Sequence, residues 1–396
     1  MKGSILKPRQ ENIIIYMLLI MVGNPTIIFY KSFIYTLYKV IFLAVVIWLL
    51  YKKNGLQIKI HNAKAAAFFA CLITFSVIIN GDESGISTLI SYYVFILLGM
   101  FISEIIPPKS FLVRFTEVMF VLCVISLLFF TLLLIKPVLL NRLLWVTVPV
   151  NEWGSYRSNI IYSAIMENFY SSADGSVVYL TKRNCGPFWE PGIFQCFISM
   201  SLVCLIENKK VKNLSVKRFI FLISALSTVS ITGMLTLAVI VIYYTVKNAR
   251  SFAVYIAAGM TGLVIGFRQT YDLFFSRIAD VFASHSLTYR IGLLGLKIDN
   301  VGKSLLCGQG FDVGNYNGYI TLFLQFGTVF LIIWLWLLYR GSNTIVNHRI
   351  LFVVILLGLT SEPIAHSAFF WLIIFYGVNP QKERVLFMRE REVSLV

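Results

Sequence analysis

The sequence predicts an all-α protein that crosses a lipid bilayer about a dozen times. Of its 396 residues, 58% are hydrophobic and only 13% are charged, which is about half the charged share of a soluble domain. Apolar runs recur from the N-terminus to about residue 377, and together they exceed what one water-soluble core buries. We therefore expect one integral membrane domain that spans residues 1–396.

Twelve apolar segments are predicted to span the membrane as helices, because lipid offers no other partner for backbone N–H and C=O groups. The residues before the first segment, MKGSILKPRQ, lead into it without a small-residue cleavage site, so we expect a retained helix and not a signal peptide. Several segments are short, so local bilayer thinning or partial re-entry is an option there. The segments are 12–30, 33–51, 65–80, 87–106, 112–135, 188–206, 218–230, 232–246, 251–267, 318–339, 350–361 and 367–378.

Basic residues predict the orientation of the chain. The net charge of +16 comes from 34 Lys+Arg against 18 Asp+Glu, and in membrane proteins such residues collect on cytoplasmic loops. With both termini in the cytoplasm, the short outside turns 80–85 and 361–367 contain no lysine or arginine. The inside segments hold the charged tail and Lys2, Lys7, Arg9, Lys52, Lys53, Lys59, Lys64, Lys109, Arg114, Lys209, Lys210, Lys212, Lys217, Arg218, Lys247, Arg250, Arg340 and Arg349.

Two outside loops, 136–187 and 268–317, are far longer than the usual connection. Both contain aromatic and apolar residues, which favours folded or interfacial segments over disorder. Residues 286–301 place apolar side chains at helical spacing, which predicts an amphipathic helix at the membrane surface. We find no inverted repeat relating the two halves, which disfavours a transporter built on repeats.

The densest polar cluster runs from Lys182 to Gly192, where the first long loop re-enters the membrane. An arginine such as Arg183 can bind a phosphate through two parallel hydrogen bonds. Glu190, near a helix start, can accept a proton from a hydroxyl if its pKa suits. The alternative is an interfacial anchor, in which Trp189 belongs to the aromatic belt, the cations bind lipid headgroups and Glu190 caps a helix.

The second long loop and the last outside turn offer further candidates. Arg290 is favoured in the loop, and the glycines of the Cys307–Gly310 turn permit close backbone approach. A lipid-headgroup contact is the alternative for each basic residue of the loop. The segment from Ser227 to Gly233 is an outside hairpin, a broken helix lining a polar cavity, or a plain turn of small residues between helices. The other candidates are Arg277, Asp280, His285, Tyr289 and Lys297 in the loop, and Glu362 and His366, which are acid/base or structural, in the turn.

Two smaller expectations concern single side chains. Lys39 lies within the second apolar segment and is expected to extend toward the outer surface. Cys185 and Cys307 both fall on outside loops, where a disulfide can form. The remaining four cysteines fall in predicted spans, and none of the six has a metal-ligand spacing. Nucleotide, zinc-protease and esterase motifs are absent from the sequence, so these activities have no support.

Five sequence motifs, in order, resemble those of the Wzy-type O-antigen polymerases and their relatives, the O-antigen ligase-like membrane family. RNCGPFWEPGIFQCFIS resembles the R-x-x-G-x-F-x-E-P-G re-entry motif of that family. ALSTVSITGML resembles its S/T-rich hairpin, and SLTYRIGLLGLKIDNVGKSLLCGQGF its second periplasmic loop. GYITLFLQFGTVFLIIW and TSEPIAHSAFFWLIIFYG resemble its closing helices. The resemblance covers roughly residues 183–378.

The resemblance implies a GT-C-like helical fold in a bacterial inner membrane, and a sugar transfer that needs no metal or cofactor. A growing glycan would pass, with inversion, from undecaprenyl pyrophosphate to a hydroxyl of the next lipid-linked repeat unit on the periplasmic side. Membrane lipids and a chain-length regulator protein are the implied partners, and no nucleic acid is expected.

The resemblance also implies roles for individual residues. Arg183 and Arg290 would neutralise the leaving pyrophosphate, and Glu190 would position or deprotonate the attacking hydroxyl, with His366 or His285 as alternative bases. The expected substrate-binding residues are Lys182, Arg157, Arg277, Gly186, Trp189, Tyr289, Gly308 and Gly310.

Two other functions remain open at the level of sequence. An O-antigen ligase would transfer the same donor glycan to lipid A–core. The lone His285 lacks the neighbours expected in a ligase, which favours the polymerase. A lipid-linked oligosaccharide flippase would need a charged central cavity and repeat symmetry. The charges instead cluster in the outside loops.

Overall fold

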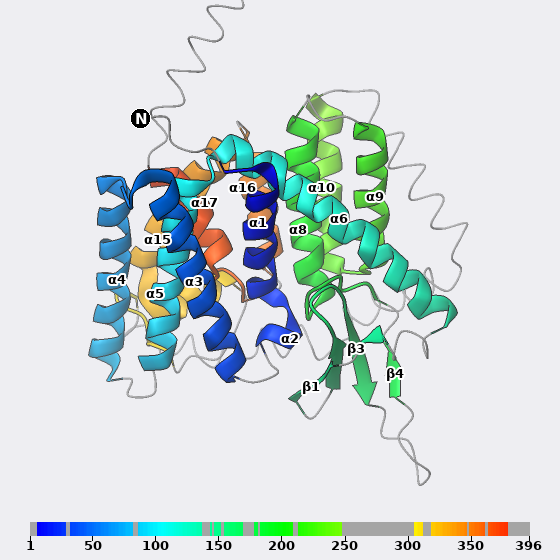
Figure 1. Ribbon diagram of the computed structural model, residues 1–396, viewed down its shortest axis with the longest axis horizontal. Helices are drawn as coiled ribbons and strands as arrows, with labels where there is room; N and C mark the ends of the chain where they lie inside the picture. Colours follow the sequence, from blue (N-terminus) through cyan, green and yellow to red (C-terminus); the bar gives the residue numbers. More distant parts are fainter. Residues whose placement is uncertain are drawn as a thin grey trace, which may run out of the picture.

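The computed structural model describes residues 6–28, 32–81, 86–136, 143–144, 146–151, 154–168, 178–180, 183–208, 213–247, 305–311, 318–346, 348–360 and 363–378. Within these ranges the chain is a bundle of apolar helices with a small β-sheet beyond one end of the bundle (Figure 1). Five helices are long and apolar enough to cross a membrane. The chain is therefore a multi-pass membrane protein, as the sequence predicts.

The first half of the bundle contains α1 (Pro8–Gly23), α2 (Pro25–Ile28), α3 (Ser32–Asn54), α4 (Ile60–Asn80), α5 (Ile86–Ile105) and α6 (Pro108–Ile135). The predicted segment 12–30 is broken between α1 and α2. Asn24 adopts an extended conformation there and Pro25 follows it, because a residue before proline is disfavoured in the α region. The remaining predicted segments of this half each coincide with one helix, of which α3 to α6 are four of the five membrane-length helices.

The second half contains α8 (Pro191–Glu207), α9 (Leu214–Ser227), α10 (Ile231–Lys247), α15 (Gly318–Ile345), α16 (Ile350–Leu359) and α17 (Ala368–Val378). Only α15 has membrane length. The others are shorter than the roughly 20 residues that a bilayer requires, in line with the predicted short segments. The predicted span 251–267 and most of the loop 268–317 lie outside the described residues.

The described chain is mainly helical, as predicted, and the first long loop adds one small antiparallel sheet that the prediction did not include. Its strands are β1 (Val146–Asn151), β2 (Gly154–Ser158), β3 (Ser163–Asn168) and β4 (Val178–Leu180), in the order β1-β2-β3-β4. Each strand pairs with the next along the chain, and Tyr156 of β2 lies opposite Val148 of β1 and Ile165 of β3. Short strands do not produce the long apolar runs that indicate spans, so the prediction recognised a folded loop without its strands.

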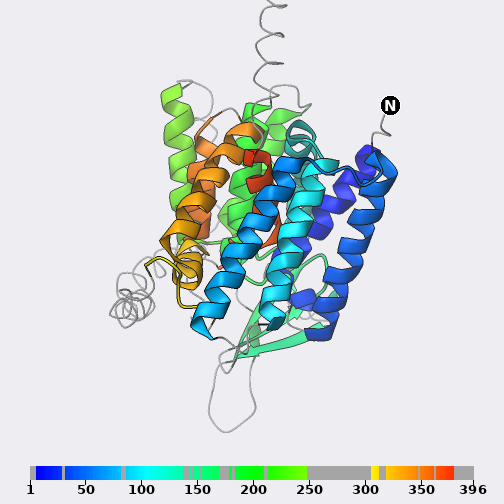
Figure 2. The ribbon, with the colours of Figure 1, turned by 90° about the vertical axis from the view of Figure 1, so that its left-hand side faces the viewer.

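The two ends of the bundle differ in chemistry. Helix α1 links them, because Glu11 in its first turn pairs with Arg114 at 3.5 Å, while Asn24 at its C-cap donates to the carbonyl of Asn159 beside the sheet. Figures 1 and 2 show the sheet beyond the same end of the bundle in both views. We call this the sheet end and the opposite one the basic end. The described cations near the basic end are Lys7, Arg9, Lys52, Lys53, Lys59, Lys64, Lys109, Arg114, Lys217, Arg218, Lys247, Arg340 and Arg349.

Helix α17 lies inside the bundle, against α5 on one side and α15 on another (Figure 1). All but one of its residues are buried. The backbones of α15 and α17 meet directly: a Cβ added to Gly341 would lie 1.8 Å from the carbonyl oxygen of Ile373. Small residues allow such close approach of helices in membranes, where dispersion forces between packed atoms drive association.

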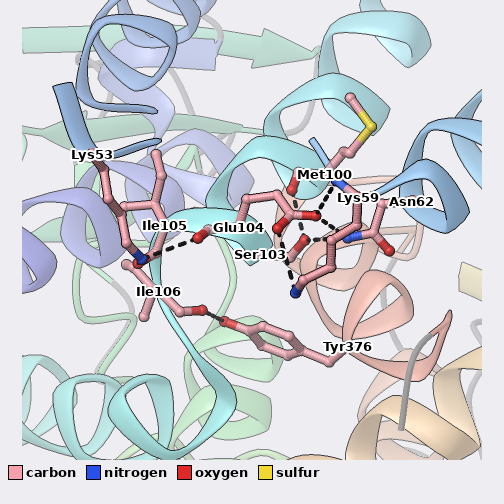
Figure 3. Close-up of polar contacts among 9 residues, drawn as sticks. All are labelled: Lys53, Lys59, Asn62, Met100, Ser103, Glu104, Ile105, Ile106 and Tyr376. Atoms are coloured by element: carbon pink, nitrogen blue, oxygen red, sulfur yellow. Dashed lines mark hydrogen bonds and ion pairs between the residues drawn. The ribbon is translucent and has the colours of Figure 1, made fainter. Parts of the chain in front are cut away.

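A polar network at the basic end fixes the corner between α3, α4 and α5 (Figure 3). The buried carboxylate of Glu104 accepts hydrogen bonds from the side chain of Asn62 at 2.6 Å and from the backbone N–H of Lys59 at 3.2 Å. Lys53 Nζ donates to the carbonyl oxygens of Glu104 and Ile105 at the end of α5. The Glu104 carboxylate lies at the start of α4, and the Lys53 ammonium lies at the end of α5. Each charge therefore complements the dipole of the helix whose end it contacts.

We expect Glu104→Ala to lower the free energy of unfolding by about 2 kcal/mol, because buried donors on α4 lose their acceptor. Glu104→Gln keeps one acceptor oxygen and should lose clearly less. Lys59→Ala should lose under about 0.5 kcal/mol, because an exposed ion pair contributes little, and the Lys59 side chain is 59% exposed. Unfolding of the three variants in detergent measures these differences. An equal loss from Lys59→Ala and Glu104→Ala would assign the effect to the ion pair.

Candidate functional site

Residues 183–190 join the sheet to α8 and form what we call the motif junction. Asn184 is fully buried within it. Its side-chain Nδ2 donates to Ser126 of α6 at 3.2 Å and to Ser227 of α9 at 2.9 Å, and its Oδ1 accepts from the backbone N–H of Gly186 at 3.0 Å. Its own backbone N–H donates to the carbonyl of Ser227. One amide side chain thus fixes the junction to two helices.

The middle of the junction contacts α1 and β3. The carbonyl of Gly186 accepts from the N–H of Ser163 in β3 at 2.7 Å, and the N–H of Trp189 donates to the carbonyl of Gly23 at 2.8 Å. Gly186 has a φ of +55°, and a Cβ there would lie 2.9 Å from the ring of Phe194, so the position requires glycine. The two predicted binding residues Gly186 and Trp189 therefore have a structural role that the sequence did not reveal.

Arg183 and Glu190 lie at the two ends of the junction, and both are half-buried. Arg183 Nε donates to the carbonyl of Thr228 at 3.2 Å. Its side chain forms no other hydrogen bond with the described residues. The two outer nitrogens of the guanidinium, Nη1 and Nη2, therefore donate no hydrogen bond to that part of the chain. Glu190 is the N-cap residue of α8, yet its side chain does not form the capping hydrogen bond. Glu190 thus occupies the cap position of α8 without a side-chain capping bond, and the interfacial-anchor alternative stays open.

The charges of Glu190 and Arg183 both affect the pKa of the Cys185 thiol. Burial raises its pKa most, the negative charge of Glu190 raises it further, and the positive charge of Arg183 lowers it. The carboxylate and the guanidinium therefore lie near one buried point of the junction, and Cys185 stays a neutral thiol. Cys185 and Cys307 are both free, so the disulfide considered from the sequence does not form in this structure.

The Ser/Thr-rich segment after α9 is a turn that supports Arg183. Helix α9 ends at Ser227 and α10 begins at Ile231, so the segment is a turn between two helices, as two of the three alternatives predicted. Thr228 Oγ1 donates to Gln195 Oε1 of α8 at 2.8 Å, and Gln195 Nε2 donates to the carbonyl of Gly233 at 3.3 Å. The carbonyl that holds Arg183 is therefore itself fixed by a buried amide of α8.

A second polar cluster surrounds a break in α15 at Gly327, whose φ is 83° and ψ is 180°. The segment 305–311 lies along the break. Gln309 N–H donates to the carbonyl of Leu324 at 2.7 Å, and Thr328 N–H donates to that of Leu305 at 2.9 Å. These bonds satisfy backbone groups that the break leaves without a helical partner, as a membrane interior requires. We call these residues, with the side chains around Gln325, the helix-break cluster.

The predicted residues Gly308 and Gly310 belong to this cluster. The N–H of Gly310 donates to the carbonyl of Gln325 at 3.2 Å, and a Cβ on Gly308 would lie 2.2 Å from that same oxygen. Ser76 of α4 also donates to this oxygen, and Tyr92 of α5 donates to Gln325 Oε1, each at 2.7 Å. The glycines thus allow the second long loop to reach the backbone of α15.

His366 lies at the edge of the helix-break cluster, in the turn before α17. Its ring is 5.4 Å from that of Tyr92 and 6.0 Å from that of Phe95, between centroids. Burial lowers the pKa of His366 to about 4, so the imidazole is neutral at pH 7 and offers a lone pair. Tyr92 stacks in turn on Phe311 of the second loop at 5.3 Å.

The predicted site residues thus fall into two clusters at the sheet end. Arg183, Gly186, Trp189 and Glu190 form the motif junction, while Gly308, Gly310 and His366 belong to the helix-break cluster. Arg157 lies apart in β2, opposite Thr147 and Ala164. The candidates Lys182, Arg277, Asp280, His285, Tyr289, Arg290, Lys297 and Glu362 lie outside the described residues. The predicted convergence of Arg183 and Arg290 on one ligand therefore stays a prediction.

The sequence analysis assigned no role to four residues that stabilise the two clusters. Asn184 and Gln195 support the motif junction, and Tyr92 and Gln325 support the helix-break cluster. Gln195 and Gln325 could have been found from the sequence, because both are amides within predicted apolar spans. Such a side chain is costly in a membrane unless it is paired, so it marks an internal contact. Within the described ranges, no group of three or more His, Cys, Asp or Glu residues could hold a metal ion.

Comparisons with models of known protein families, with curated proteins and with solved structures found no match for this chain. The fold and the apolar composition define its class as a multi-pass, mainly helical membrane protein. Its finer assignment depends on the two clusters at the sheet end.

Proposed function

We propose that this chain is a surface-polysaccharide polymerase of the O-antigen type in a bacterial inner membrane. It would transfer a growing glycan from undecaprenyl pyrophosphate to the next lipid-linked repeat unit. The observation that carries the proposal is the motif junction, which holds Arg183 and Glu190 on one fixed segment. The outer nitrogens of Arg183 are not used by the described fold. The five motifs in family order add to this support.

The orientation in this proposal places the basic end in the cytoplasm and the sheet end in the periplasm, which follows the preference of lysine and arginine for the inner side. Most of the described cations near helix ends gather at the basic end, whereas Lys136, at the C-cap of α6, lies at the opposite end of its helix. The motif junction and the helix-break cluster would then both face the compartment in which lipid-linked repeat units are joined.

The proposed chemistry is a direct displacement. The bond between the anomeric carbon and the pyrophosphate oxygen breaks, and the anomeric carbon bonds to the acceptor's hydroxyl oxygen with inversion. The proton of that hydroxyl passes to Glu190. Arg183, together with the predicted Arg290, stabilises the negative charge of the leaving undecaprenyl pyrophosphate. The leaving group supplies the driving force. Neutral His366 is the alternative base, from the helix-break cluster.

Substitution of Arg183 tests the proposal in a strain that lacks its own copy of the protein. We expect Arg183→Ala to lower long-chain polysaccharide by about a hundredfold or more, because one charge-stabilising donor contributes on that scale. Arg183→Lys, which lacks the bidentate fork, should restore only part of the product. Gel analysis of surface polysaccharide measures the effect. Arg9→Ala, at an exposed position of the basic end, is the matched control for membrane level.

Three outcomes separate the proposal from its rivals. A deletion strain that displays a single repeat unit on its core supports the polymerase, whereas a strain that displays none indicates a ligase. Purified chain in proteoliposomes should elongate lipid-linked repeat units, which a flippase would only move across the bilayer. Normal long-chain product from Arg183→Ala, at a normal protein level, contradicts the role given to the motif junction.

A further inference from the structure

Gln195 is a buried amide in the second turn of α8, with only 1% of the residue exposed. Its Oε1 accepts from Thr228 Oγ1 at 2.8 Å, and its Nε2 donates to the carbonyl of Gly233 at 3.3 Å. The carbonyl fixes which way the amide is turned, because an amide oxygen in place of Nε2 would face another acceptor. An amide is costly in an apolar helix of a membrane protein, so a glutamine here indicates a specific task.

The contacts of Gln195 lead through the hairpin after α9 to Arg183. The carbonyl of Thr228 accepts from Arg183 Nε at 3.2 Å, which is the only hydrogen bond that the guanidinium forms with the described residues. The hydroxyl hydrogen of Thr228 is shared between Gln195 and the carbonyl of Ala225, at 2.8 and 2.7 Å. The bond to Ala225 stays within the end of α9, whereas the bond to Gln195 ties the hairpin to α8.

The backbone of the hairpin is strained directly after Thr228. Val229 has a φ of +48°, in a region that a β-branched residue rarely adopts. Such a conformation persists only where the surrounding contacts fix it, and it is typical of functional sites. The direction of the Thr228 carbonyl depends on this turn, because that carbonyl belongs to the peptide group that joins Thr228 to Val229. The contacts that hold the turn therefore also aim the acceptor of Arg183.

Helix α8 positions both charged residues of the motif junction. Glu190 is its N-cap residue, and Gln195 follows about 7.5 Å further along the helix axis. Between them, Phe194 packs against the junction, since a Cβ added to Gly186 would lie 2.9 Å from its ring. One rigid element thus sets the place of the carboxylate and the place of the carbonyl that holds Arg183.

We infer that Gln195 is a positioning residue, which sets the direction of the Arg183 guanidinium through the carbonyl of Thr228. This inference rests on the proposed function and deepens it, because it gives α8 the task of fixing the cation relative to the base. With Nε held by Thr228, the two outer nitrogens form a fork of fixed direction that suits two oxygens of a phosphate group. Without the amide the guanidinium turns away, and the charge on the leaving group is stabilised less.

Elongation of lipid-linked repeat units by the purified chain in proteoliposomes tests the inference. We expect Gln195→Met to lower kcat about tenfold or more with little change in the KM for the donor, because a misplacement of about 1 Å can cost about a hundredfold. Thr228→Val keeps the carbonyl but lacks the hydroxyl, so it should have a similar effect. Ser199→Ala is the matched control, because Ser199 contacts the same amide at 3.5 Å but lies on α8 itself. Its kcat should stay close to that of the wild type.

A double variant separates positioning from a general loosening of the fold. Lysine has a methylene group where arginine has Nε, so in Arg183→Lys the carbonyl of Thr228 has no Nε–H to orient. Adding Gln195→Met to Arg183→Lys should therefore cause no further loss of kcat. The Tm in detergent shows whether each variant folds, and Thr228→Val alone decides the test if Gln195→Met does not.

Two results would overturn the inference. One is a normal kcat for the folded Gln195→Met and Thr228→Val variants, and the other is a further loss in the Arg183→Lys background as large as in the wild type. Either result, together with an inactive Arg183→Ala, leaves the proposed function in place. Full activity of Arg183→Ala would instead contradict the role given to the motif junction, and the inference with it.

Discussion

Replacing Gly327 with alanine is expected to prevent the second loop from docking and to destabilise the protein severely. The glycine has a φ of +83°, and an added Cβ would lie 2.3 Å from the carbonyl oxygen of Leu306 and 2.8 Å from the N–H nitrogen of Cys307. With its ψ of 180°, this backbone conformation is essentially restricted to glycine and costs an L-residue about 1–3 kcal/mol. The overlap is with backbone, which cannot rotate away, so the hydrogen bonds along the break must also be lost. The Tm in detergent and the yield of monodisperse protein measure the effect.

Gly81→Ala is the matched control for that substitution. Gly81 also has a positive φ, of 64°, but no atom of the described residues lies within 4 Å of an added Cβ. It should therefore show only the cost of the left-handed conformation, and its Tm should lie between those of the wild type and Gly327→Ala. Equal Tm values for the two alanine variants would show that the docking of residues 305–311 contributes no measurable stability.

The second large effect is expected for Asn184→Leu, which keeps a similar volume and removes every polar atom of the side chain. The N–H of Gly186 then loses its acceptor in a buried environment, and the serines of α6 and α9 lose the donor of Asn184 but keep their own hydrogen bonds to Cys123 and Ser224. We expect a loss of about 2–4 kcal/mol in the free energy of unfolding, because three buried hydrogen bonds are lost and one buried N–H is left unpaired. Unfolding in detergent, followed by tryptophan fluorescence, measures the loss.

Two variants make the Asn184 result specific. Asn184→Asp keeps the oxygen that accepts from Gly186 but loses both donor hydrogen bonds and buries a carboxyl group, so it should also be strongly destabilised. Asn12→Leu, on half-buried Asn12 of α1, removes one long hydrogen bond of 3.5 Å to Glu117 and should have a small effect. If Asn184→Leu unfolds like Asn12→Leu, the junction is not held by this side chain.

The helices were predictable because an apolar segment that spans a membrane must satisfy its backbone hydrogen bonds within a helix. A segment such as 112–135 has no polar residue pattern that water could solvate, so length and hydropathy place α6 within a few residues. The β-strands of the first long loop were not predictable in the same way. Val146–Asn151 is short, and its pairing depends on β2. A strand of this kind is defined by its neighbours more than by its own composition.

The candidate site was predictable in its residue types and only partly in its geometry. Charges at the re-entry of a loop drew attention to Arg183 and Glu190, and the structure holds them on one segment. Sequence alone does not reveal that Asn184 bonds to Ser126, which lies 58 positions earlier. Such contacts depend on which helices become neighbours. The expectation that Lys39 extends to the outer surface is wrong for the same reason, because its Nζ donates to Ser91 Oγ of α5 at 2.6 Å.

Helix α17 has a consequence for how this protein is made. A ribosome releases the C-terminal hairpin after every other described element has entered the membrane, yet that hairpin fills the middle of the finished assembly. Until α17 is inserted, the contacts that it makes with α5 and α15 cannot form. The glycine contacts between α15 and α17 thus form only after α17 has entered the membrane, so a chain that stops before Ala368 should lack the packing that joins α5 to α15.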